Sequence, residues 1–529
     1  MTEQKKVLPL AMVIDLGTTG GRIALVDSAG TIQAMSYREY SSIFHSPTVI
    51  DHDPETWLWS IRENAAELKR KVPELFPLIQ AVTVTSQRAT FIPVDAKGKP
   101  IAHAILWQDK RSVKEAAYLR ETIGEQTIFA KTGLKIDPYF SLPKLLWLRS
   151  ERAEIYETAA YFLSVHDFAI FALTGEFKTD WTQASRTMLF NIHEFAWDEE
   201  LAGMVNIDLG KMPKAYPTGT IAGPVTAEAA EAYGIPAGLP VVMSGGDQQC
   251  AALGVGAIEP GIVKVTTGTG SFVVAPTDKP ITSPEHKVVC STSAVPGQWI
   301  IEAGIFTSGS TYRWLRDLLV DDRSYEKLNE LALASVPGAN GVLHVPHYAG
   351  SAAPYWNADA TGVLMGVSLG TSRADIVRAY LEGICFEVNK NLRIIDSILQ
   401  QEEDAEYKRL SAIHVCGGLV QFDLFNQIQA DIFGIVVIPN TTEQGSAVGA
   451  AMNAFTSIGV FADLKEAHRA MSQLDMTRMK TTNRGLKAVY AEMSALHDAL
   501  YHSLNNNDMY ARLKQTASRF GEALEDQLN

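Results

Sequence analysis

The fold is decided by the stretch Met-Val-Ile-Asp-Leu-Gly-Thr-Thr-Gly-Gly-Arg at residues 12–22. The apolar residues before Asp15 predict a buried strand, and the apolar run that ends at Val26 predicts a second strand. The Gly/Thr turn between them lets backbone N–H groups approach an anion closely, and an acid at a strand end suits a divalent cation. This combination favours a site for the phosphates of a Mg-nucleotide, with a plain β-hairpin as the alternative. The sequence has no Gly-Lys-Ser/Thr, which excludes a P-loop.

Length, charge and cysteine content limit the class of protein. A chain of 529 residues exceeds the usual size of one hydrophobic core, so at least two domains are expected. The net charge of −14 disfavours binding to nucleic acid. Four cysteines without a Cys-x-x-Cys pair argue against metal and disulfide frameworks and favour a reducing cytoplasm. No uncharged stretch is long enough to cross a bilayer, so we expect a cytoplasmic protein without a membrane partner.

A second glycine-rich turn repeats the character of the first one. Thr266-Thr267-Gly268-Thr269-Gly270-Ser271 lies between two apolar runs, and a third glycine element, Gly417-Gly418, follows the apolar run at 413–415. Each element alone is a weak signal. Three of them in this order, each at the end of a predicted strand, predict a duplicated α/β fold that holds a nucleotide between its halves.

Asp247 is the candidate for chemistry. It follows Gly245-Gly246 at the end of a predicted strand and precedes a predicted helix. One interpretation is a helix N-cap, a position where Asp is favoured. The other is a carboxylate that accepts a hydroxyl proton during phosphoryl transfer, a reaction that needs alignment and charge neutralisation more than a strong base. The helix dipole is expected to keep this carboxylate ionised.

Three further residues have the chemistry to contact a polyhydroxylated substrate. Arg88 and Tyr139 offer hydrogen-bond donors, and Trp107 offers a flat apolar wall for the carbon face of a sugar or polyol. Taken singly, each is also explained by a structural role, a salt bridge for Arg88 and a core position for the two aromatic residues. We expect Asp109 and Arg111 to pair with each other.

Together these motifs resemble the FGGY family of carbohydrate kinases. The matching motifs are Ile-Asp-Leu-Gly-Thr-Thr-Gly-Gly-Arg (14–22), Trp-Gln-Asp-Lys-Arg (107–111), Gly-Gly-Asp-Gln-Gln (245–249) and Gly-Thr-Gly (268–270), and residues 139–151 and 362–382 are similar to the two family signatures. The resemblance spans residue 12 to about residue 500. It implies an α/β fold of two actin-like (ribonuclease H-like) ATPase domains around a central cleft. It also implies transfer of the γ-phosphate of MgATP to a sugar or polyol hydroxyl.

The resemblance also implies roles for single residues, matched motif by motif. Asp247 would be the catalytic base and Asp15 the carboxylate associated with Mg²⁺. The implied substrate-binding residues are Arg88, Trp107, Tyr139, Asp247, Gln248 and Phe272. The implied nucleotide-binding residues are Thr18, Thr19, Gly20, Arg22, Thr269, Gly309, Arg313 and Gly418. We expect a domain with the substrate site and the first phosphate loop at 1–252, a nucleotide-binding domain at 253–504 and a helical tail at 505–529, in a homodimer or a homotetramer.

The sequence leaves the substrate open between branches of the family. Segments 133–141, 184–191 and 246–249 look most like glycerol kinase, but Ala89 stands where glycerol kinases have Glu, and Arg313 and Phe422 also depart from that pattern. The smaller Ala89 is expected to make room for a larger substrate. The motif at 107–111 is closer to xylulokinases. We therefore expect ATP-dependent phosphorylation of a small polyol or ketose, with glycerol, a pentulose such as xylulose, a tetritol and autoinducer-2 as candidates.

Two alternatives from other classes are a non-catalytic actin-like nucleotide sensor and an ATP-hydrolysing chaperone of the same superfamily. Retention of Asp15, Asp247 and both phosphate loops argues against the sensor. The substrate-side residues at 88, 107, 139 and 247 are difficult to explain in a chaperone.

Overall fold

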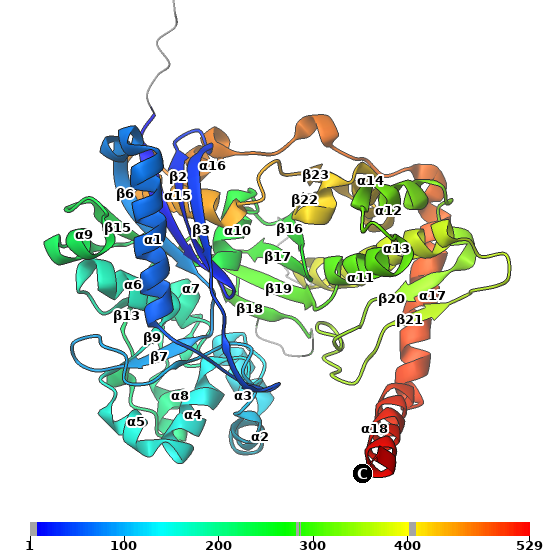
Figure 1. Ribbon diagram of the computed structural model, residues 1–529, viewed down its shortest axis with the longest axis horizontal. Helices are drawn as coiled ribbons and strands as arrows, with labels where there is room; N and C mark the ends of the chain where they lie inside the picture. Colours follow the sequence, from blue (N-terminus) through cyan, green and yellow to red (C-terminus); the bar gives the residue numbers. More distant parts are fainter. Residues whose placement is uncertain (1–7, 282–284, 286, 401–408, 529) are drawn as a thin grey trace, which may run out of the picture.

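The computed structural model describes residues 8–281, 285, 287–400 and 409–528 and contains two six-stranded sheets (Figure 1). The first sheet has the order β14-β15-β6-β1-β2-β3 and the second has the order β18-β19-β17-β16-β22-β23. The strands of the first sheet are β1 (Leu10–Leu16), β2 (Gly20–Asp27), β3 (Ile32–Glu39), β6 (Ile79–Ser86), β14 (Ile221–Pro224) and β15 (Pro240–Gly246). Those of the second are β16 (Ile262–Thr267), β17 (Ser271–Thr277), β18 (Val289–Thr292), β19 (Trp299–Ile305), β22 (Ala412–Cys416) and β23 (Val436–Pro439).

The two sheets share one pairing pattern. β1 pairs with β2 antiparallel and with β6 parallel, just as β16 pairs with β17 antiparallel and with β22 parallel. The next strand outward is parallel in both sheets, β15 beside β6 and β23 beside β22. Each glycine-rich turn therefore joins two neighbouring antiparallel strands of its own sheet, β1 with β2 and β16 with β17, and the predicted duplication of an α/β fold is confirmed.

Smaller sheets and helices complete the chain. A five-stranded sheet holds β4 (Ile43–Ser46), β5 (Val49–His52), β8 (Ala104–Ile105), β7 (Phe91–Val94) and β9 (Tyr161–Ser164), and two-stranded sheets hold β10 (Lys178–Asp180) with β13 (Lys214–Tyr216), β11 (Phe190–Asn191) with β12 (Ala196–Trp197) and β20 (Leu343–Val345) with β21 (Val363–Met365). The helices before the second sheet are α1 (Glu55–Lys71), α2 (Val113–Thr122), α3 (Glu125–Thr132), α4 (Ser141–Glu151), α5 (Ala153–Thr158), α6 (Val165–Thr174), α7 (Trp181–Ala184), α8 (Glu199–Val205), α9 (Ala227–Tyr233) and α10 (Asp247–Gly254). The later ones are α11 (Gly309–Leu319), α12 (Tyr325–Leu333), α13 (Arg373–Gln400), α14 (Asp423–Phe433), α15 (Gly445–Ser457), α16 (Leu464–Met471), α17 (Lys487–Asn506) and α18 (Met509–Leu528).

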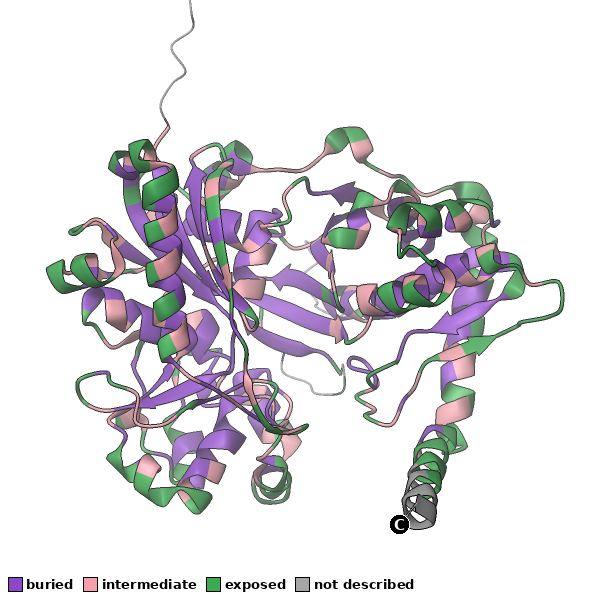
Figure 2. Ribbon diagram, viewed as in Figure 1, coloured by how far each residue is buried: buried purple, intermediate pink, exposed green. Residues whose placement is uncertain are grey.

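The central strand β1 is buried along its whole length because helices cover both faces of the first sheet (Figure 2). Its even-numbered residues, such as Met12 and Ile14, pack in the same core as Trp57 and Ile61 of α1. Its odd-numbered Val13 packs on the other face, in the core that contains α15. A strand covered on both faces has no polar side, which explains the continuous apolar run in the sequence.

Helix α15 comes from the C-terminal half of the chain but packs against the first sheet (Figure 1). It crosses α10 at a distance that only glycine allows. A Cβ atom on Gly254 would lie 2.0 Å from the carbonyl oxygen of Gly445, and one on Gly449 would lie 1.9 Å from that of Cys250. Because α10 begins at Asp247, this crossing fixes the helix that carries the candidate catalytic residue.

No helix in the described part of the chain is both long enough and apolar enough to cross a membrane.

Candidate active site

The first glycine-rich loop connects β1 and β2 and contacts the start of α15. The Asp15 carboxylate at the end of β1 accepts a hydrogen bond from Ser446 Oγ (2.9 Å), and the Arg22 Nε atom lies 3.7 Å from Asp15 Oδ2. Arg22 also donates to the side chain of Gln444. Of the other predicted loop residues, Thr18 and Thr19 lie between the two strands, and Gly20 is the first residue of β2. Thr19 O accepts a hydrogen bond from the backbone N–H of residue 40 (3.1 Å). Residues 444–446 therefore hold both ends of this loop.

The second glycine-rich loop docks onto the start of α11. The backbone N–H of Gly309 donates to Gly268 O (2.9 Å), and the Ser310 N–H donates to Thr269 O (3.1 Å). A Cβ atom on Gly309 would lie 2.4 Å from Gly268 O. The close approach of loop and helix therefore requires glycine at position 309, and it directs the positive end of α11 toward Thr269.

These residues line a pocket of about 470 Å³ in the second domain. Thr269, Gly309, Arg313 and Gly418, four of the predicted nucleotide-binding residues, all line it, and so does Phe422. The other four, Thr18, Thr19, Gly20 and Arg22, lie in the first loop and do not line this pocket. The structure thus divides the predicted nucleotide site into a pocket in one domain and a loop in the other.

Asp247 is the first residue of α10, and Gly246 occupies the N-cap position with an extended backbone (φ −75°, ψ 141°). Of the two interpretations of Asp247, the helix N-cap is therefore wrong, because strand β15 continues through Gly246 and the helix begins one residue earlier than a cap at Asp247 requires. Asp247 Oδ1 accepts a hydrogen bond from Gln248 N (2.7 Å). Burial raises the pKa of the Asp247 carboxyl, and the nearby Arg88 opposes that rise. Loss of water on burial has the larger effect on this pKa.

Arg88 links Asp247 to a carboxylate from the other domain. Its Nη1 and Nη2 atoms donate to the two carboxylate oxygens of Glu302 at 2.5 and 3.1 Å, and its Nε atom lies 3.4 Å from Asp247 Oδ1. Glu302 belongs to β19 of the second sheet, whereas Arg88 follows β6 of the first. This bidentate ion pair therefore joins the two domains beside the candidate base.

A second arginine shares the same carboxylate. Arg186 Nη1 lies 3.5 Å from Glu302 Oε1, and its guanidinium carbon lies 5.7 Å from the ring centroid of Tyr139 and 5.1 Å from that of Phe140. Burial raises the pKa of the Glu302 carboxyl, but Arg186 and Arg88 outweigh it and lower the pKa to about 2. Glu302 therefore stays ionised and neutralises two buried guanidinium groups.

Lys264 provides another contact between the domains. It is fully buried on β16, and its Nζ atom donates to Gln248 Oε1 at 2.8 Å. Burial lowers the pKa of the Lys264 amine. Register places Lys264 opposite Val274 and Val274 opposite Glu302, so both charged residues lie on one face of the second sheet. We call Arg88, Arg186, Asp247, Gln248, Lys264 and Glu302 the substrate-side cluster.

Phe272 lies on the same face of the second sheet as Glu302. Register pairs Phe272 of β17 with Gly304 of β19, two residues along from the Val274–Glu302 pair. Its side chain is exposed. An exposed aromatic ring next to a buried charged cluster is consistent with a wall of a binding site.

The aromatic pair Trp107 and Tyr139 is tied to both the first loop and the cluster. The ring centroids are 5.3 Å apart, and Trp107 Nε1 donates to Thr18 Oγ1 at 2.9 Å. The fully buried Lys144 donates from Nζ to Tyr139 O (2.6 Å) and to Ala89 O (3.2 Å), and burial lowers the pKa of its amine to about 7. One lysine therefore fixes the backbone on either side of the predicted substrate site.

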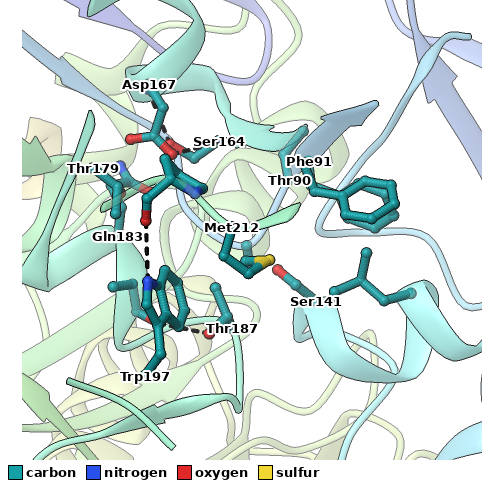
Figure 3. Close-up of a pocket in the computed structure, with 15 residues that line it drawn as sticks. Thr90, Phe91, Ser141, Ser164, Asp167, Thr179, Gln183, Thr187, Trp197 and Met212 are labelled. Carbon is teal, nitrogen blue, oxygen red and sulfur yellow. Dashed lines mark hydrogen bonds between the residues drawn. The ribbon is translucent and has the colours of Figure 1, made fainter. Parts of the chain in front are cut away.

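Ala89 has a left-handed backbone (φ 62°) and lines a small cavity. Figure 3 shows other residues that line this cavity, among them Thr90 and Ser141. The cavity measures about 20 Å³, and its polar lining includes Asp167 and Gln183. This is about the volume of one water molecule. That Ala89 makes room for a larger substrate stays a prediction.

Asp109 and Arg111 pair with each other, as predicted. Arg111 Nε donates to Asp109 Oδ1 (2.9 Å), and Asp109 Oδ2 accepts from the backbone N–H of Ile50 (2.6 Å). Asp109 is fully buried. Both residues anchor the loop that follows β8 to strand β5. Both carboxylate oxygens of Asp109 accept hydrogen bonds within the protein, and the residue is buried away from ligands.

Sequence reasoning missed three members of the substrate-side cluster, namely Arg186, Lys264 and Glu302. Lys264 and Glu302 each stand alone in an apolar strand, in Ile-Val-Lys-Val and Ile-Ile-Glu-Ala. A single charge in a buried strand is costly unless it is paired, so each was a signal for a partner elsewhere. Arg186 lies in segment 184–191, which resembles glycerol kinase, but it does not stand alone in an apolar strand as Lys264 and Glu302 do.

Comparison with known proteins decides the family. Residues 10–254 match the N-terminal domain and residues 263–458 the C-terminal domain of the FGGY family of carbohydrate kinases. The chain belongs to this family. It is therefore an α/β protein with two FGGY, actin-like domains, and a kinase that uses ATP and an alcohol group as acceptor.

Individual FGGY relatives include kinases for different substrates. The chain is 35% identical to a glycerol kinase of Trichlorobacter lovleyi over 472 residues, which cover 87% of this chain and 92% of the relative. A structure of Plasmodium falciparum glycerol kinase with ADP superposes with a TM-score of 0.84 at 25% identity, covering 94% of this chain and 98% of the other. A ligand-bound xylulose kinase of Lactobacillus acidophilus superposes with a TM-score of 0.87 at 23% identity, covering 94% and 99%, and shows the shared fold alone.

Proposed function

We propose that this FGGY kinase transfers the γ-phosphate of ATP to a hydroxyl of a small polyol or ketose, and that Asp247 is its catalytic base. The observation that carries the proposal is the position of Asp247, at the start of α10 and 3.4 Å from an arginine that is itself held by Glu302 of the second domain. The glycerol kinase relatives, at 35% identity, support a polyol substrate. A pentulose or autoinducer-2 is the alternative substrate within the same reaction class.

Asp247 accepts the proton of the attacking hydroxyl in this mechanism. Burial raises the pKa of the Asp247 carboxyl toward the range of a useful general base, and the charge of Arg88 opposes that rise. The ion pair with Glu302 holds the Arg88 guanidinium rigidly, so that Nε faces Asp247 while the substrate hydroxyl is aligned. Alignment of this kind supplies much of the rate enhancement in phosphoryl transfer.

The remaining predicted substrate residues are assigned to the same substrate site as Asp247. Gln248 is oriented by Lys264, which occupies its carbonyl oxygen and leaves the amide NH₂ to donate to a substrate oxygen. Trp107 and Tyr139 form an aromatic wall on the first domain, and Phe272 supplies a second apolar surface from β17. Such apolar faces pack against the carbon chain of a polyol.

The nucleotide is assigned to the pocket lined by Thr269, Gly309, Arg313 and Gly418, with its phosphates directed toward the first loop. The positive end of the α11 dipole lies beside Thr269, and this partial charge together with the threonine hydroxyls of the two loops suits phosphate oxygens. Asp15 would hold Mg²⁺, which neutralises charge on the phosphates. A single carboxylate fits this ion, which takes one or two carboxylates together with phosphates, and no cluster of three His, Cys, Asp or Glu residues occurs in the described ranges.

A coupled ADP-release assay tests the proposal. Purified protein with MgATP is offered glycerol, xylulose, ribulose, erythritol and an autoinducer-2 precursor, and the expected result is ADP release stimulated by at least one of them. The matched control is Asp247→Asn, which keeps the size of the side chain and removes its basicity. Equal ADP release with and without every compound would favour the nucleotide sensor instead.

The oligomeric state, a homodimer or a homotetramer, and the cytoplasmic location stay predictions. Light scattering on the purified protein measures the first. The domain limits at residues 252 and 504 also stay predictions, and limited proteolysis would locate accessible linkers near them.

A further inference from the structure

Asp180, at the end of β10, is a fully buried carboxylate that lies outside the substrate-side cluster. It caps the short helix α7, because its side chain accepts hydrogen bonds from the backbone N–H groups of Thr182 and Gln183 at 3.0 and 3.1 Å. A helix cap of this kind needs only backbone donors. Two hydroxyls nevertheless donate to the same oxygen, Asp180 Oδ2, namely Thr182 Oγ1 at 2.7 Å and Thr218 Oγ1 at 2.5 Å. Helix capping therefore explains only part of the surroundings of this carboxylate.

The Thr182 hydroxyl connects Asp180 to the end of strand β15. Because an ionised carboxylate only accepts hydrogen bonds, the Thr182 proton is committed to Asp180, and the hydroxyl oxygen is left to accept. It accepts from the backbone N–H of Gly246 at 2.8 Å. Gly246 directly precedes Asp247 in the sequence. A chain of two hydrogen bonds therefore runs from a buried carboxylate to the peptide before the candidate base.

The peptide that joins Gly245 to Gly246 is held from both of its polar sides. Its carbonyl oxygen accepts a hydrogen bond from Thr85 Oγ1 at 2.9 Å, and its N–H donates to Thr182. Gly245 has a left-handed backbone (φ 81°), and a Cβ atom there would lie 2.0 Å from Thr182 Oγ1 and 2.3 Å from Asp180 Oδ2. The peptide therefore has little freedom to turn, and α10 starts directly after it.

We propose that Thr182 is a positioning residue for the phosphoryl transfer, and that Asp180 fixes the direction of its hydroxyl. By holding the Gly246 N–H, the pair sets the orientation of the peptide from which Asp247 extends. It thereby sets the separation of 3.4 Å between Asp247 Oδ1 and Arg88 Nε. A shift of about 1 Å in a reacting group can cost about 100-fold in rate. This inference rests on the proposed function, because it requires Asp247 to accept the substrate proton.

The test removes the hydroxyl of Thr182 and, as a matched control, the other hydroxyl that donates to Asp180. Thr182→Val leaves the Gly246 N–H without its acceptor, whereas Thr218→Val takes a hydrogen bond from the same carboxylate oxygen and does not touch Gly246. The values of kcat and KM are measured by ADP release with MgATP and with whichever of glycerol, xylulose, ribulose and erythritol the native protein uses best. Thr182→Val is expected to lower kcat by about 10- to 100-fold with little change in the KM for MgATP. Thr218→Val is expected to leave kcat nearly unchanged.

Two further measurements separate positioning from folding. Thr182→Ser retains the hydroxyl and is expected to recover most of the lost kcat. Thermal denaturation is expected to show a lower melting temperature for both valine variants, because each takes one hydrogen bond from the buried Asp180. If Thr182→Val does not fold, Thr182→Ala takes its place in the comparison.

The outcomes that contradict the inference differ from those that contradict the kinase proposal. If Thr182→Val and Thr218→Val lower kcat equally, or if Thr182→Ser is as slow as Thr182→Val, Thr182 serves folding and the inference is overturned. An unchanged kcat in Thr182→Val would overturn it as well. A native protein that releases no ADP with any of the compounds would overturn the kinase proposal, and this inference with it.

Discussion

The two halves of the candidate active site are built by different means. The substrate-side cluster consists of buried charged side chains, where Glu302 and Lys264 reach from the second sheet to Arg88 and Gln248 of the first domain. The pocket assigned to the nucleotide instead lies where a glycine-rich loop meets the start of a helix, and a Cβ on Gly309 would lie 2.4 Å from Gly268 O. A single substitution is therefore expected to disturb the substrate-side cluster through its charges and the second region through the close approach of loop and helix.

The largest effect is expected from removing the base on the substrate side. Asp247→Ala should lower kcat by about 10²–10⁴-fold, the usual contribution of a positioned general base. Binding of MgATP should stay within about threefold, since the pocket lined by Gly309 and Gly418 does not include Asp247. Steady-state kinetics and calorimetric titration of nucleotide measure the two values. Full activity would remove Asp247 from the mechanism, and loss of nucleotide binding would show that the two halves are not separate.

Breaking the charged cluster should cost stability. Arg88→Met leaves Glu302 buried without its main partner, and the loss of one member of a buried ion pair costs about 3–5 kcal/mol. The matched control is Arg62→Met, which disrupts an exposed pair worth less than about 1 kcal/mol. Thermal denaturation of the two variants gives the difference. Similar melting temperatures for both would mean that the cluster is well hydrated and contributes little to the contact between domains.

A smaller effect is expected from the backbone of the nucleotide pocket. Gly309→Ala forces a methyl group against Gly268 O and should cost about 1–3 kcal/mol, with weaker binding of ADP. Gly268→Ala is the matched control, because a Cβ there meets no atom within 4 Å. Titration with ADP and a thermal melt are made on both variants. If Gly268→Ala proves as harmful as Gly309→Ala, the loop rather than the helix start determines the shape of the pocket.

The smallest expected effect is a shift in pH dependence. Because burial raises the pKa of Asp247, kcat/KM should fall as the pH drops, and it should begin to fall at a higher pH than an ordinary aspartate would cause. Arg88 lowers this pKa, so Arg88→Lys, which keeps a more distant charge, should move the acid limb to still higher pH. A pH–rate profile of both proteins shows the limb. An acid limb at the same pH in both would mean that Arg88 does not act on Asp247 electrostatically.

Much of this architecture could be predicted from local sequence patterns. The strand, glycine turn and strand around Gly17 and around Gly268 predicted both central hairpins, because apolar runs and glycines act within a few residues. Their duplication predicted two domains of one fold. The predicted nucleotide residues from Thr269 to Gly418 meet in one pocket since each follows a strand of the same sheet.

The substrate side was less predictable because its contacts join distant parts of the chain. Glu302 and Arg88 are separated by 214 positions in the sequence, and the residues around each of them do not indicate the other as its partner. Ala89 lines a cavity of about 20 Å³ together with Leu145, Phe162 and Met212. A helix N-cap was one of two interpretations of Asp247, and the structure has Gly246 at the cap position instead. Such outcomes depend on tertiary packing, which single-sequence patterns do not encode.

The glycine crossing of α10 and α15 has a consequence for the order in which the enzyme matures during synthesis. Residues 250 and 254 are translated nearly 200 residues before their partners at 445 and 449. Domains generally fold as they leave the ribosome. The face of α10 that packs against α15 nevertheless lacks this partner until residues 445–457 have been translated. Until then, the apolar face that contains Val13 and Leu253 is uncovered. A nascent or truncated chain that lacks α15 is therefore expected to be inactive and prone to aggregation, so that catalytic competence arrives only when the last quarter of the protein is being made.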